Sequence, residues 1–231
     1  GYTNLLSMLD LAGIPLHADE RDDGDPIVVA GGHAAFNPEP IADFIDVAVL
    51  GDGEEASLHI SDIVREWKQE GRPGGRDGLL ERLAETGAFY IPRFYNVEYL
   101  DDGRIMRVAP NRPAAPFQVR KHTLMDLDAW PYPKKPIVPL AETVHERYSV
   151  EIFRGCTRGC RFCQAGMITR PVRERNIQTI GEMVAGGLEA TGLEEIGLLS
   201  LSSADHSEIA DVTKQLADRY EGTNVSLSLP S

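Results

Sequence analysis

The sequence predicts an α/β protein built on two parallel β-sheets. Three observations lead to this fold class. Short apolar strands alternate with segments of helical periodicity in both halves of the chain, glycine-rich loops follow several of these strands, and the segment between the halves changes to antiparallel strands and proline. Alternation of strands and helices is typical of parallel sheets with helical crossovers. The 231 residues are enough to form two modest cores.

The first half alternates helix-like and strand-like segments. The apolar residues of 3–12 recur at helical spacing, and Gly13 ends that helix. Residues 26–30 and 47–50 are short apolar strands, each followed by glycines, and a helix is expected over 54–70. We therefore expect parallel strands joined by helices in this half.

The middle of the chain has a different pattern. Residues 71–78 are rich in Gly and Arg and are interpreted as a linker. Residues 87–108 predict a small antiparallel unit whose hairpin turn lies at 101–103. The proline-rich segment 109–140 predicts an extended connector. The expected division of the chain is therefore 1–75, 76–145 and 146–231.

The second half begins a further parallel α/β unit. Residues 149–153, 195–201 and 225–229 are apolar strands, and helices are expected over 176–190 and 207–220. The order strand, loop, helix, strand, helix, strand suits the opening of a barrel or an open sheet. Because the chain starts in a helix-like run and stops on a strand, we expect it to be part of a longer protein.

Composition and charge limit the classes of function. The net charge of −13 argues against a surface that attracts nucleic acid. No stretch approaches the about 20 apolar residues that span a bilayer, and residues 1–10 lack the pattern of a signal peptide. The three cysteines are clustered rather than spread in pairs. This favours a metal site in a reducing cytoplasm over a disulfide framework.

Cys156, Cys160 and Cys163 form a C-x3-C-x2-C motif directly after a predicted strand. Glycines at 155, 159 and 166 would let the backbone wrap tightly around a compact group. Thiolates select iron–sulfur clusters, zinc or copper(I). Three cysteines fill three corners of a four-iron cluster and leave the fourth iron open to a ligand.

Structural zinc is the alternative for this motif. Zinc sites usually combine one close cysteine pair with a second ligand pair further along the chain. The nearest histidines, His145 and His206, are single residues and form no such pair. The spacing therefore favours the open-cornered cluster.

Arginines gather around the cysteines in this otherwise acidic chain. Between residues 154 and 175 the only acid is Glu174, and the six basic residues are Arg154, Arg158, Arg161, Arg170, Arg173 and Arg175. Two interpretations are open: a solvated, partly salt-bridged surface, or charge compensation for thiolates, cluster and an anionic ligand.

The cysteine motif, with Phe162 before its last cysteine, resembles that of the radical S-adenosylmethionine (SAM) superfamily. The resemblance implies that residues 146–231 are the first strands and helices of a partial TIM-like radical SAM barrel. It implies that Cys156, Cys160 and Cys163 ligate a [4Fe–4S] cluster whose open iron binds SAM. Reduction would then cleave SAM to a 5′-deoxyadenosyl radical. An electron donor such as flavodoxin or ferredoxin is the implied partner.

The resemblance also suggests residues that contact SAM. Members of the superfamily hold the methionine amino group at the end of the second barrel strand, where this chain has Ser202 and Ser203 instead of Gly-Gly-Glu. The alternative there is helix capping by Asp205 or Ser207. Ser228 on the third strand is a candidate for the SAM carboxylate, with an ordinary strand residue as the alternative. No catalytic residue is assigned.

Residues 1–75 resemble the C-terminal part of a Rossmann-like, cobalamin-binding-type domain that precedes many radical SAM barrels. Gly31 and Gly32 follow the first strand and would allow a nucleotide-like tail to approach the backbone; a tight turn is the alternative. Cobalamin is thus a further candidate cofactor. The Asp-x-His-x-x-Gly motif that supplies a lower cobalt ligand is absent, and His33 is interpreted as a loop residue.

Three functions follow from these expectations. The first is a radical SAM enzyme, with cobalamin-linked methyl transfer or another C–H functionalisation as its reaction. The second is methylthiolation of tRNA or protein, which would need a second three-cysteine cluster that this sequence lacks. The third is a non-catalytic iron–sulfur redox or sensor module. The chain alone, with about three barrel strands, is expected to be inactive.

Overall fold

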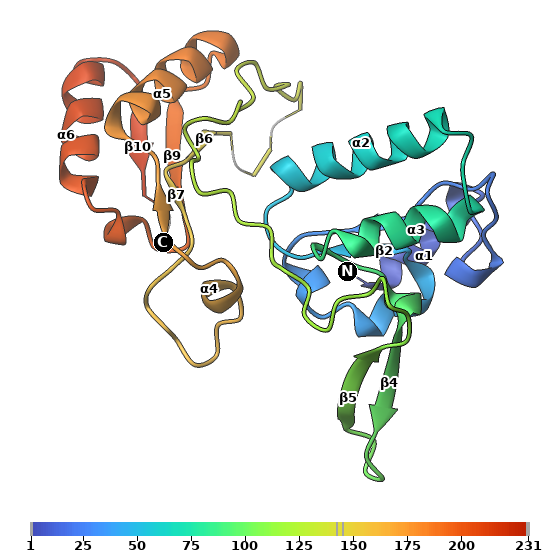
Figure 1. Cartoon of the computed structure of the whole chain (residues 1–231). Coiled ribbons are helices and arrows are strands. Elements are labelled where there is room, and N and C mark those ends of the chain that lie inside the picture. Colours follow the sequence, from blue (N-terminus) through green and yellow to red (C-terminus); the bar gives the residue numbers. More distant parts are fainter. Residues whose placement is uncertain (1, 142, 145, 230–231) are drawn as a thin grey trace. The chain divides into compact units, whose positions relative to one another are not determined.

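The computed structural model describes residues 2–141, 143–144 and 146–229. The chain forms two compact units, Gly1–Leu124 and Met125–Ser231 (Figure 1). Each unit combines helices with a small sheet that contains parallel strand pairs, so the predicted α/β class is confirmed. The finer three-part division stays a prediction. Within the described residues, no helix is long and apolar enough to cross a membrane.

The first unit is built on a three-stranded sheet in the order β1-β2-β3. β1 (Val29–Ala30) and β2 (Val47–Val49) are parallel, as the sequence predicts. β3 (Phe89–Tyr90) pairs antiparallel with β2. Phe89 was expected in the antiparallel unit that follows, but its fully buried ring belongs to the core of this sheet instead.

Both faces of this sheet are covered. Val47 and Val49 pack with α2 (Glu54–Gln69) and α3 (Gly75–Glu85) in the largest core cluster of the unit. Ala48 points to the other face and packs with Ile41 and Ile45. α1 (Tyr2–Leu11) and η3 (Glu39–Phe44) contribute Leu5 and Phe44 to this second cluster. The other short helical elements of the unit are η1 (Ala18–Glu20), η2 (His33–Phe36) and η4 (Pro92–Phe94).

Helix α3 corrects the prediction of a linker over 71–78. The helix begins at Gly75 and buries Leu79, Leu80 and Leu83 against the sheet. Gly74 adopts a left-handed conformation at its N-cap, with φ 73°. The glycines around residue 75 therefore form the turn between two helices.

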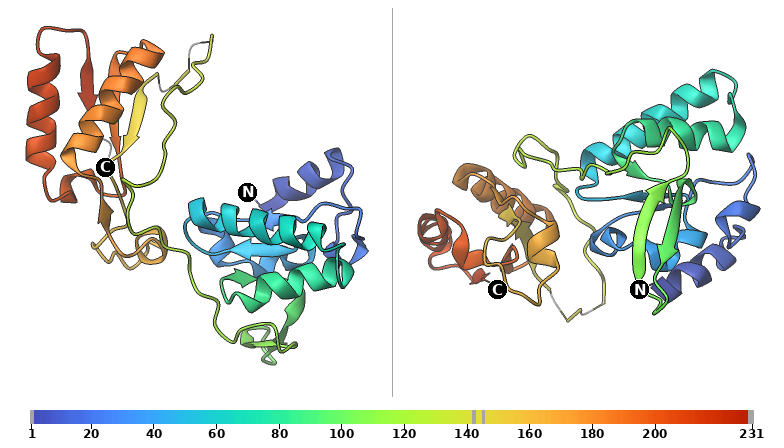
Figure 2. Two further views of the ribbon diagram at one scale, coloured as in Figure 1. Left: turned by 45° about the horizontal axis from the view of Figure 1, so that its top comes forward. Right: turned by 60° about the horizontal axis from the view of Figure 1, so that its bottom comes forward.

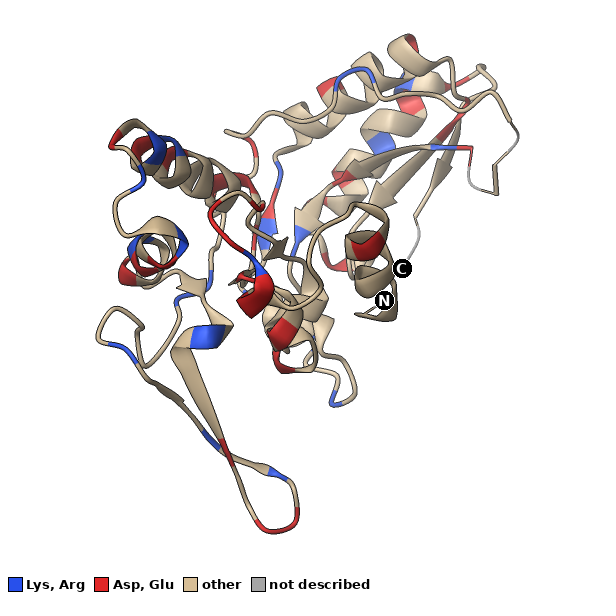
Figure 3. Ribbon diagram, turned by 90° about the vertical axis from the view of Figure 1, so that its right-hand side faces the viewer, with Lys and Arg blue, Asp and Glu red and all other residues tan. Residues whose placement is uncertain are grey.

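The predicted hairpin is present as β4 (Tyr95–Tyr99) and β5 (Ile105–Pro110). The two strands are antiparallel and carry charges of both signs, which Figure 3 shows along the projecting ribbon. Asp102 accepts hydrogen bonds from the backbone and side chain of Arg104 in the turn. The hairpin belongs to the first compact unit.

A buried ion network holds the loops of the first unit together. Asp46 is 1 % exposed and forms ion pairs with Arg21 (Nη1 to Oδ2, 2.9 Å) and Arg76 (Nη2 to Oδ2, 2.8 Å). The Val28 N–H also donates to Asp46 Oδ2 at 2.8 Å. Arg76 Nε also donates to Asp46 Oδ1 at 3.3 Å, and further donors of both guanidinium groups go to backbone carbonyls. No local sequence pattern predicts this network.

The second unit contains a parallel sheet in the order β10-β9-β6. Its strands are β6 (Tyr148–Glu151), β9 (Glu195–Leu199) and β10 (Ser226–Ser228), and the crossovers are α5 (Ile177–Thr191) and α6 (Ile209–Tyr220) (Figure 2). Val150, Ile196 and Leu198 share one core cluster with both helices. The predicted strand and helix order of this half is therefore confirmed.

Asn176 explains where α5 begins. Its side chain accepts a hydrogen bond from the Thr179 N–H at 2.7 Å, which satisfies a donor of the first turn. Gly192, with φ 70°, ends the helix in a left-handed conformation. These local signals fix the length of the helix that packs on β6.

Two glycines on α5 give a matched prediction. A Cβ at Gly187 would lie 2.0 Å from the Tyr148 ring, whereas a Cβ at Gly186 would meet nothing within 4 Å. We expect Gly187→Ala to destabilise the second unit by about 1–3 kcal/mol through overpacking. Gly186→Ala should instead stabilise it by up to about 1 kcal/mol through helix propensity. Urea unfolding of both variants, followed by circular dichroism, measures the difference; equal effects would contradict the Tyr148 contact.

Candidate metal centre

The three cysteines lie on one closed loop of the second unit. β7 (Phe153–Arg154) and β8 (Arg173–Glu174) pair antiparallel and form its neck. Gly155 has φ 98°, and a Cβ there would lie 2.5 Å from the Pro171 carbonyl oxygen. Only glycine fits this close approach. The neck thus presents the loop after β6, at the carboxyl end of the parallel sheet.

Two of the thiols converge around Gly166. A Cβ on Gly166 would lie 3.6 Å from Cys163 Sγ and 4.0 Å from Cys156 Sγ. The Gly166 N–H donates to Cys163 Sγ at 3.3 Å, and the Arg158 N–H donates to Cys156 Sγ at 3.4 Å. Hydrogen bonds to sulfur of this kind tune iron–sulfur sites. The short helix α4 (Ala165–Ile168) begins two residues after Cys163, with Gln164 as its N-cap.

Cys160 is exposed, while Cys156 is buried and Cys163 is intermediate. Within the described residues, no three His, Cys, Asp or Glu side chains are close enough together to hold a metal ion as they stand. The chemistry of the donor set nevertheless fits a cluster, because all three candidate ligands are thiols on one glycine-containing loop and two of them already receive backbone donors. Ligation would require Cys160 to turn inward.

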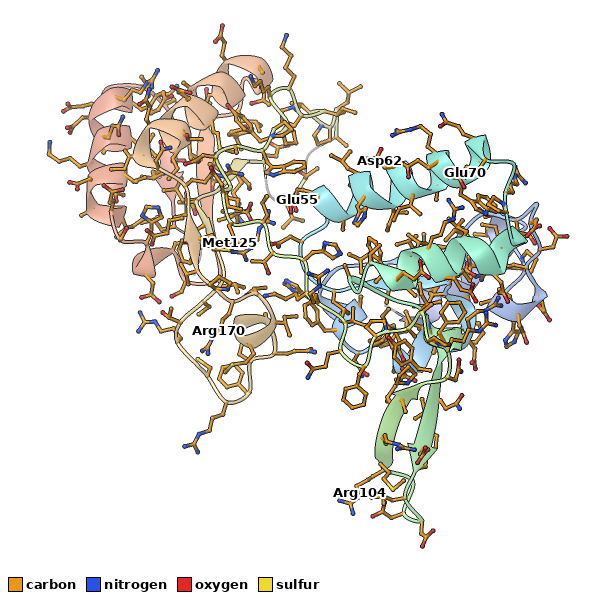
Figure 4. The ribbon with its side chains drawn as sticks, in the orientation of Figure 1. Glu55, Asp62, Glu70, Arg104, Met125 and Arg170 are labelled. Carbon is orange, nitrogen blue, oxygen red and sulfur yellow. The ribbon has the colours of Figure 1, made fainter. Side chains whose placement is uncertain are left out.

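Four of the six arginines around the motif contact backbone carbonyls or Glu151. Arg173 and Arg175 are buried and donate to backbone carbonyls, which fixes the loop neck. Arg170, labelled in Figure 4, comes from the returning arm of the loop and donates from Nε to the Cys156 carbonyl at 3.3 Å. Arg154 pairs with Glu151 at 3.0 Å. These four side chains favour the salt-bridged and structural interpretation of the basic patch.

Arg158 has a different partner. Its Nε donates to Asp205 Oδ2 at 2.6 Å, and its Nη2 donates to Asp205 Oδ1. The hydrogen bond from Arg158, followed by one from Ser202, lowers the pKa of the Asp205 carboxyl from its ordinary value. The cysteine loop is thereby tied to the turn that follows β9.

The serines predicted to contact SAM lie in this turn, which includes η5 (Ser203–Asp205). Ser203 is buried, and its hydroxyl donates to the Leu198 carbonyl at 2.9 Å. Ser202 is half-buried and donates its backbone N–H to Ser200 Oγ at 3.1 Å. The Ser203 hydroxyl and the Ser202 N–H take part in the hydrogen bonds of the turn, and the assignment of both serines to SAM stays a prediction.

Helix capping, the alternative for this segment, is wrong. α6 begins at Ile209 after Glu208, which makes no side-chain cap. The Asp205 carboxylate is bound by Arg158, and Ser207 hydrogen-bonds to Glu174.

His206, one of the two histidines weighed for zinc, is buried. Its Nε2 contacts the Arg175 carbonyl at 3.2 Å, and its Nδ1 accepts the Glu208 N–H. Both ring nitrogens are therefore engaged by backbone groups. His145 lies outside the described residues.

The other predicted residues are half-buried or exposed. Ser228 is in register with Gly197 and Ser149, on the face opposite the apolar side chains that pack against the helices. In the first unit, Gly31 and Gly32 follow β1 and are exposed, with nothing within 4 Å of a Cβ at either position. Gly32 has φ 82°. His33 is exposed in η2, which agrees with its interpretation as a loop residue.

Sequence reasoning missed the pairing of Arg158 with Asp205. The two residues are 47 positions apart, and nothing in their local patterns distinguishes them from surface charges. One usable signal was topological: the loops after β6 and β9 leave adjacent parallel strands at the same sheet edge, so their charged residues can meet.

Comparison with known proteins finds matches to a family model and to a curated relative. Residues 1–92 match the family described as "Radical SAM proteins, N-terminal". The chain is also 25% identical over 211 residues to the uncharacterized protein MJ0966 of Methanocaldococcus jannaschii. That alignment covers 90% of this chain and 38% of the relative, so the chain spans well under half of the relative's length.

The chain also has a partial match among solved structures. It is the radical S-adenosylmethionine methyltransferase TsrM from Kitasatospora setae, with tryptophan substrate and a SAM analog bound. The TM-score is 0.46 at 14% sequence identity, over 86% of this chain and 35% of that one.

Proposed function

We propose, from the premise that this chain is a radical SAM superfamily protein, that Cys156, Cys160 and Cys163 bind a [4Fe–4S] cluster with an open corner for SAM. The main support for this proposal is that the Cys156 and Cys163 thiols converge around Gly166 and each accepts a hydrogen bond from a backbone N–H. The exposed Cys160 supplies the third thiolate by turning inward.

The reduced cluster, when bound, supplies the electron that cleaves SAM to a 5′-deoxyadenosyl radical. The residues of this chain hold and orient the ligands. The glycines of the loop allow close backbone approach, and the N–H groups of Arg158 and Gly166 stabilise two of the thiolate sulfurs. Ser202, Ser203 and Ser228 are the candidates for polar contacts with SAM. The reductant is a small electron carrier such as flavodoxin or ferredoxin, and the protein works in the cytoplasm.

The reaction of the whole protein is cobalamin-linked methyl transfer or another C–H functionalisation. The support for cobalamin is the open backbone at Gly31 and Gly32, at the carboxyl end of a parallel strand. A Cβ at either glycine would meet nothing, so there is room for a nucleotide-like tail to approach. No residue of this chain is assigned as a lower cobalt ligand.

The test uses the protein that contains this chain. It is reconstituted anaerobically with iron and sulfide, reduced with dithionite, and given SAM. We expect 5′-deoxyadenosine or S-adenosylhomocysteine to form, and Cys160→Ala to form neither. A loaded, reduced protein that leaves SAM intact would contradict the enzyme assignment and favour a non-catalytic iron–sulfur module.

A further inference from the structure

The contact between Arg158 and Asp205 joins two loops that leave neighbouring strands. Arg158 lies between the first two cysteines, and Asp205 lies in the turn after β9. The guanidinium group engages both carboxylate oxygens, with Nε to Oδ2 at 2.6 Å. Two parallel hydrogen bonds fix the orientation of both partners, which a single contact between point charges does not.

The turn that carries Asp205 is itself held firmly. The Ser200 and Ser203 hydroxyls lie 3.0 Å apart, and Ser203 donates to the Leu198 carbonyl of β9. The Ser202 N–H donates to Ser200 Oγ at 3.1 Å, and the Asp205 N–H donates to the Ser202 carbonyl at 2.8 Å. Asp205 is therefore presented from a fixed position relative to the sheet.

Arg158 connects this fixed carboxylate to a thiol. While its side chain binds Asp205, its backbone N–H donates to Cys156 Sγ at 3.4 Å. Rotation of the Arg158 backbone would break the sulfur contact. The side-chain contact restrains that rotation, because the guanidinium cannot keep both hydrogen bonds if its own backbone turns away.

We propose that Asp205 is a positioning residue that acts through Arg158 to hold the Cys156 thiol ready for the cluster. This proposal rests on the proposed function, because it assigns a role in assembling the same site. We call the hydrogen-bonded pair of Arg158 and Asp205 the loop clamp.

The loop clamp contributes little to the stability of the whole unit. The Arg158 side chain is 59% exposed and that of Asp205 is 24% exposed. Exposed ion pairs contribute little to the free energy of unfolding. The effect of the clamp is therefore local, on the loop segment from Cys156 to Cys160, and a residue-specific measurement is needed to observe it.

The test measures thiol alkylation in the reduced, cluster-free chain. Iodoacetamide labelling of each cysteine is followed over time by peptide mass spectrometry. We expect Asp205→Asn to raise the labelling rate of Cys156 about fivefold, as the loss of one hydrogen bond would. Cys163 serves as the internal reference, because its sulfur contact comes from Gly166.

Three further variants separate positioning from charge and from unfolding. Asp218→Asn removes an exposed ion pair with Lys214 in the same unit and should leave the labelling rate of every cysteine unchanged. The double variant Arg158→Gln with Asp205→Asn removes both charges. It should still raise the labelling rate of Cys156, by the same factor as either single change. Circular dichroism should show native folding in all of them.

Two results would overturn the proposal. One is an unchanged ratio of Cys156 to Cys163 labelling in folded Asp205→Asn. The other is an equal rise in the labelling rates of Cys156 and Cys160 that is absent from the double variant. That pattern would show that the unpaired charge of Arg158 changes the labelling, and not the loss of positioning.

Measuring iron uptake and iron loss tests this proposal separately from the proposed function. After reconstitution, Asp205→Asn should lose iron to a chelator about fivefold faster than the unchanged protein. Failure of the unchanged protein to take up iron would refute the cluster, while the alkylation result would still decide whether the loop clamp exists.

Discussion

Replacing Cys156 with alanine is expected to abolish cluster binding. Cys156 is the most buried of the three thiols and receives both the Arg158 N–H at sulfur and the Arg170 side chain at its carbonyl. With one of three ligands gone, iron content after anaerobic reconstitution should fall from about four to below about one atom per chain. SAM cleavage by the whole protein should fall below detection.

Thr157→Ala is the matched control for this change. Thr157 is the next residue of the same loop, is exposed, and carries no thiol. Its replacement should leave iron content and the visible absorption of the cluster unchanged. If Cys156→Ala retained about four iron atoms per chain, the ligand assignment would be wrong.

Asp46→Asn is expected to give the largest loss of stability. The change leaves Arg21 and Arg76 buried without their shared carboxylate, and the new amide N–H₂ has no acceptor opposite two guanidinium groups. Breaking a buried ion network in this way costs about 3–5 kcal/mol. Since domains are stable by only about 5–15 kcal/mol, the first unit should be close to unfolding.

The fluorescence of Trp67 measures this effect on the first unit. Trp67 is buried there, and a Trp130→Phe background removes the signal from the second unit. Asp43→Asn is the control, because it makes the same chemical change at an exposed position in η3. Equal urea midpoints for Asp46→Asn and Asp43→Asn would show that the network contributes nothing to stability.

The sequence predicted the elements whose signals are local. The apolar spacing of 176–190 indicated α5 and that of 54–70 indicated α2, because helical periodicity acts within a few turns. α3 was missed because the glycines of 71–78 obscured the apolar face formed by Leu79, Leu80 and Leu83. β3 was placed in the antiparallel unit over 87–108 and not beside β2, because a two-residue strand does not specify its partner.

The candidate site shows the same limit. Its cysteines could be predicted because their spacing within one loop is itself the signal. The loop clamp and the Arg21–Asp46–Arg76 network depend on residues that are distant in sequence, 47 and 25 positions apart for Arg158–Asp205 and Arg21–Asp46. Only the folded strand order brings such charges together, so composition and local pattern could not reveal them.

The central claim is that the three cysteines hold a four-iron cluster with one corner open to SAM. The most direct measurement is the electron paramagnetic resonance spectrum of the reconstituted, reduced protein that contains this chain, recorded with and without SAM. We predict the signal of a reduced [4Fe–4S] cluster whose g values shift when SAM binds the open iron. A cluster signal that SAM leaves unchanged, or the absence of any cluster signal from protein loaded with iron and sulfide, would contradict the claim.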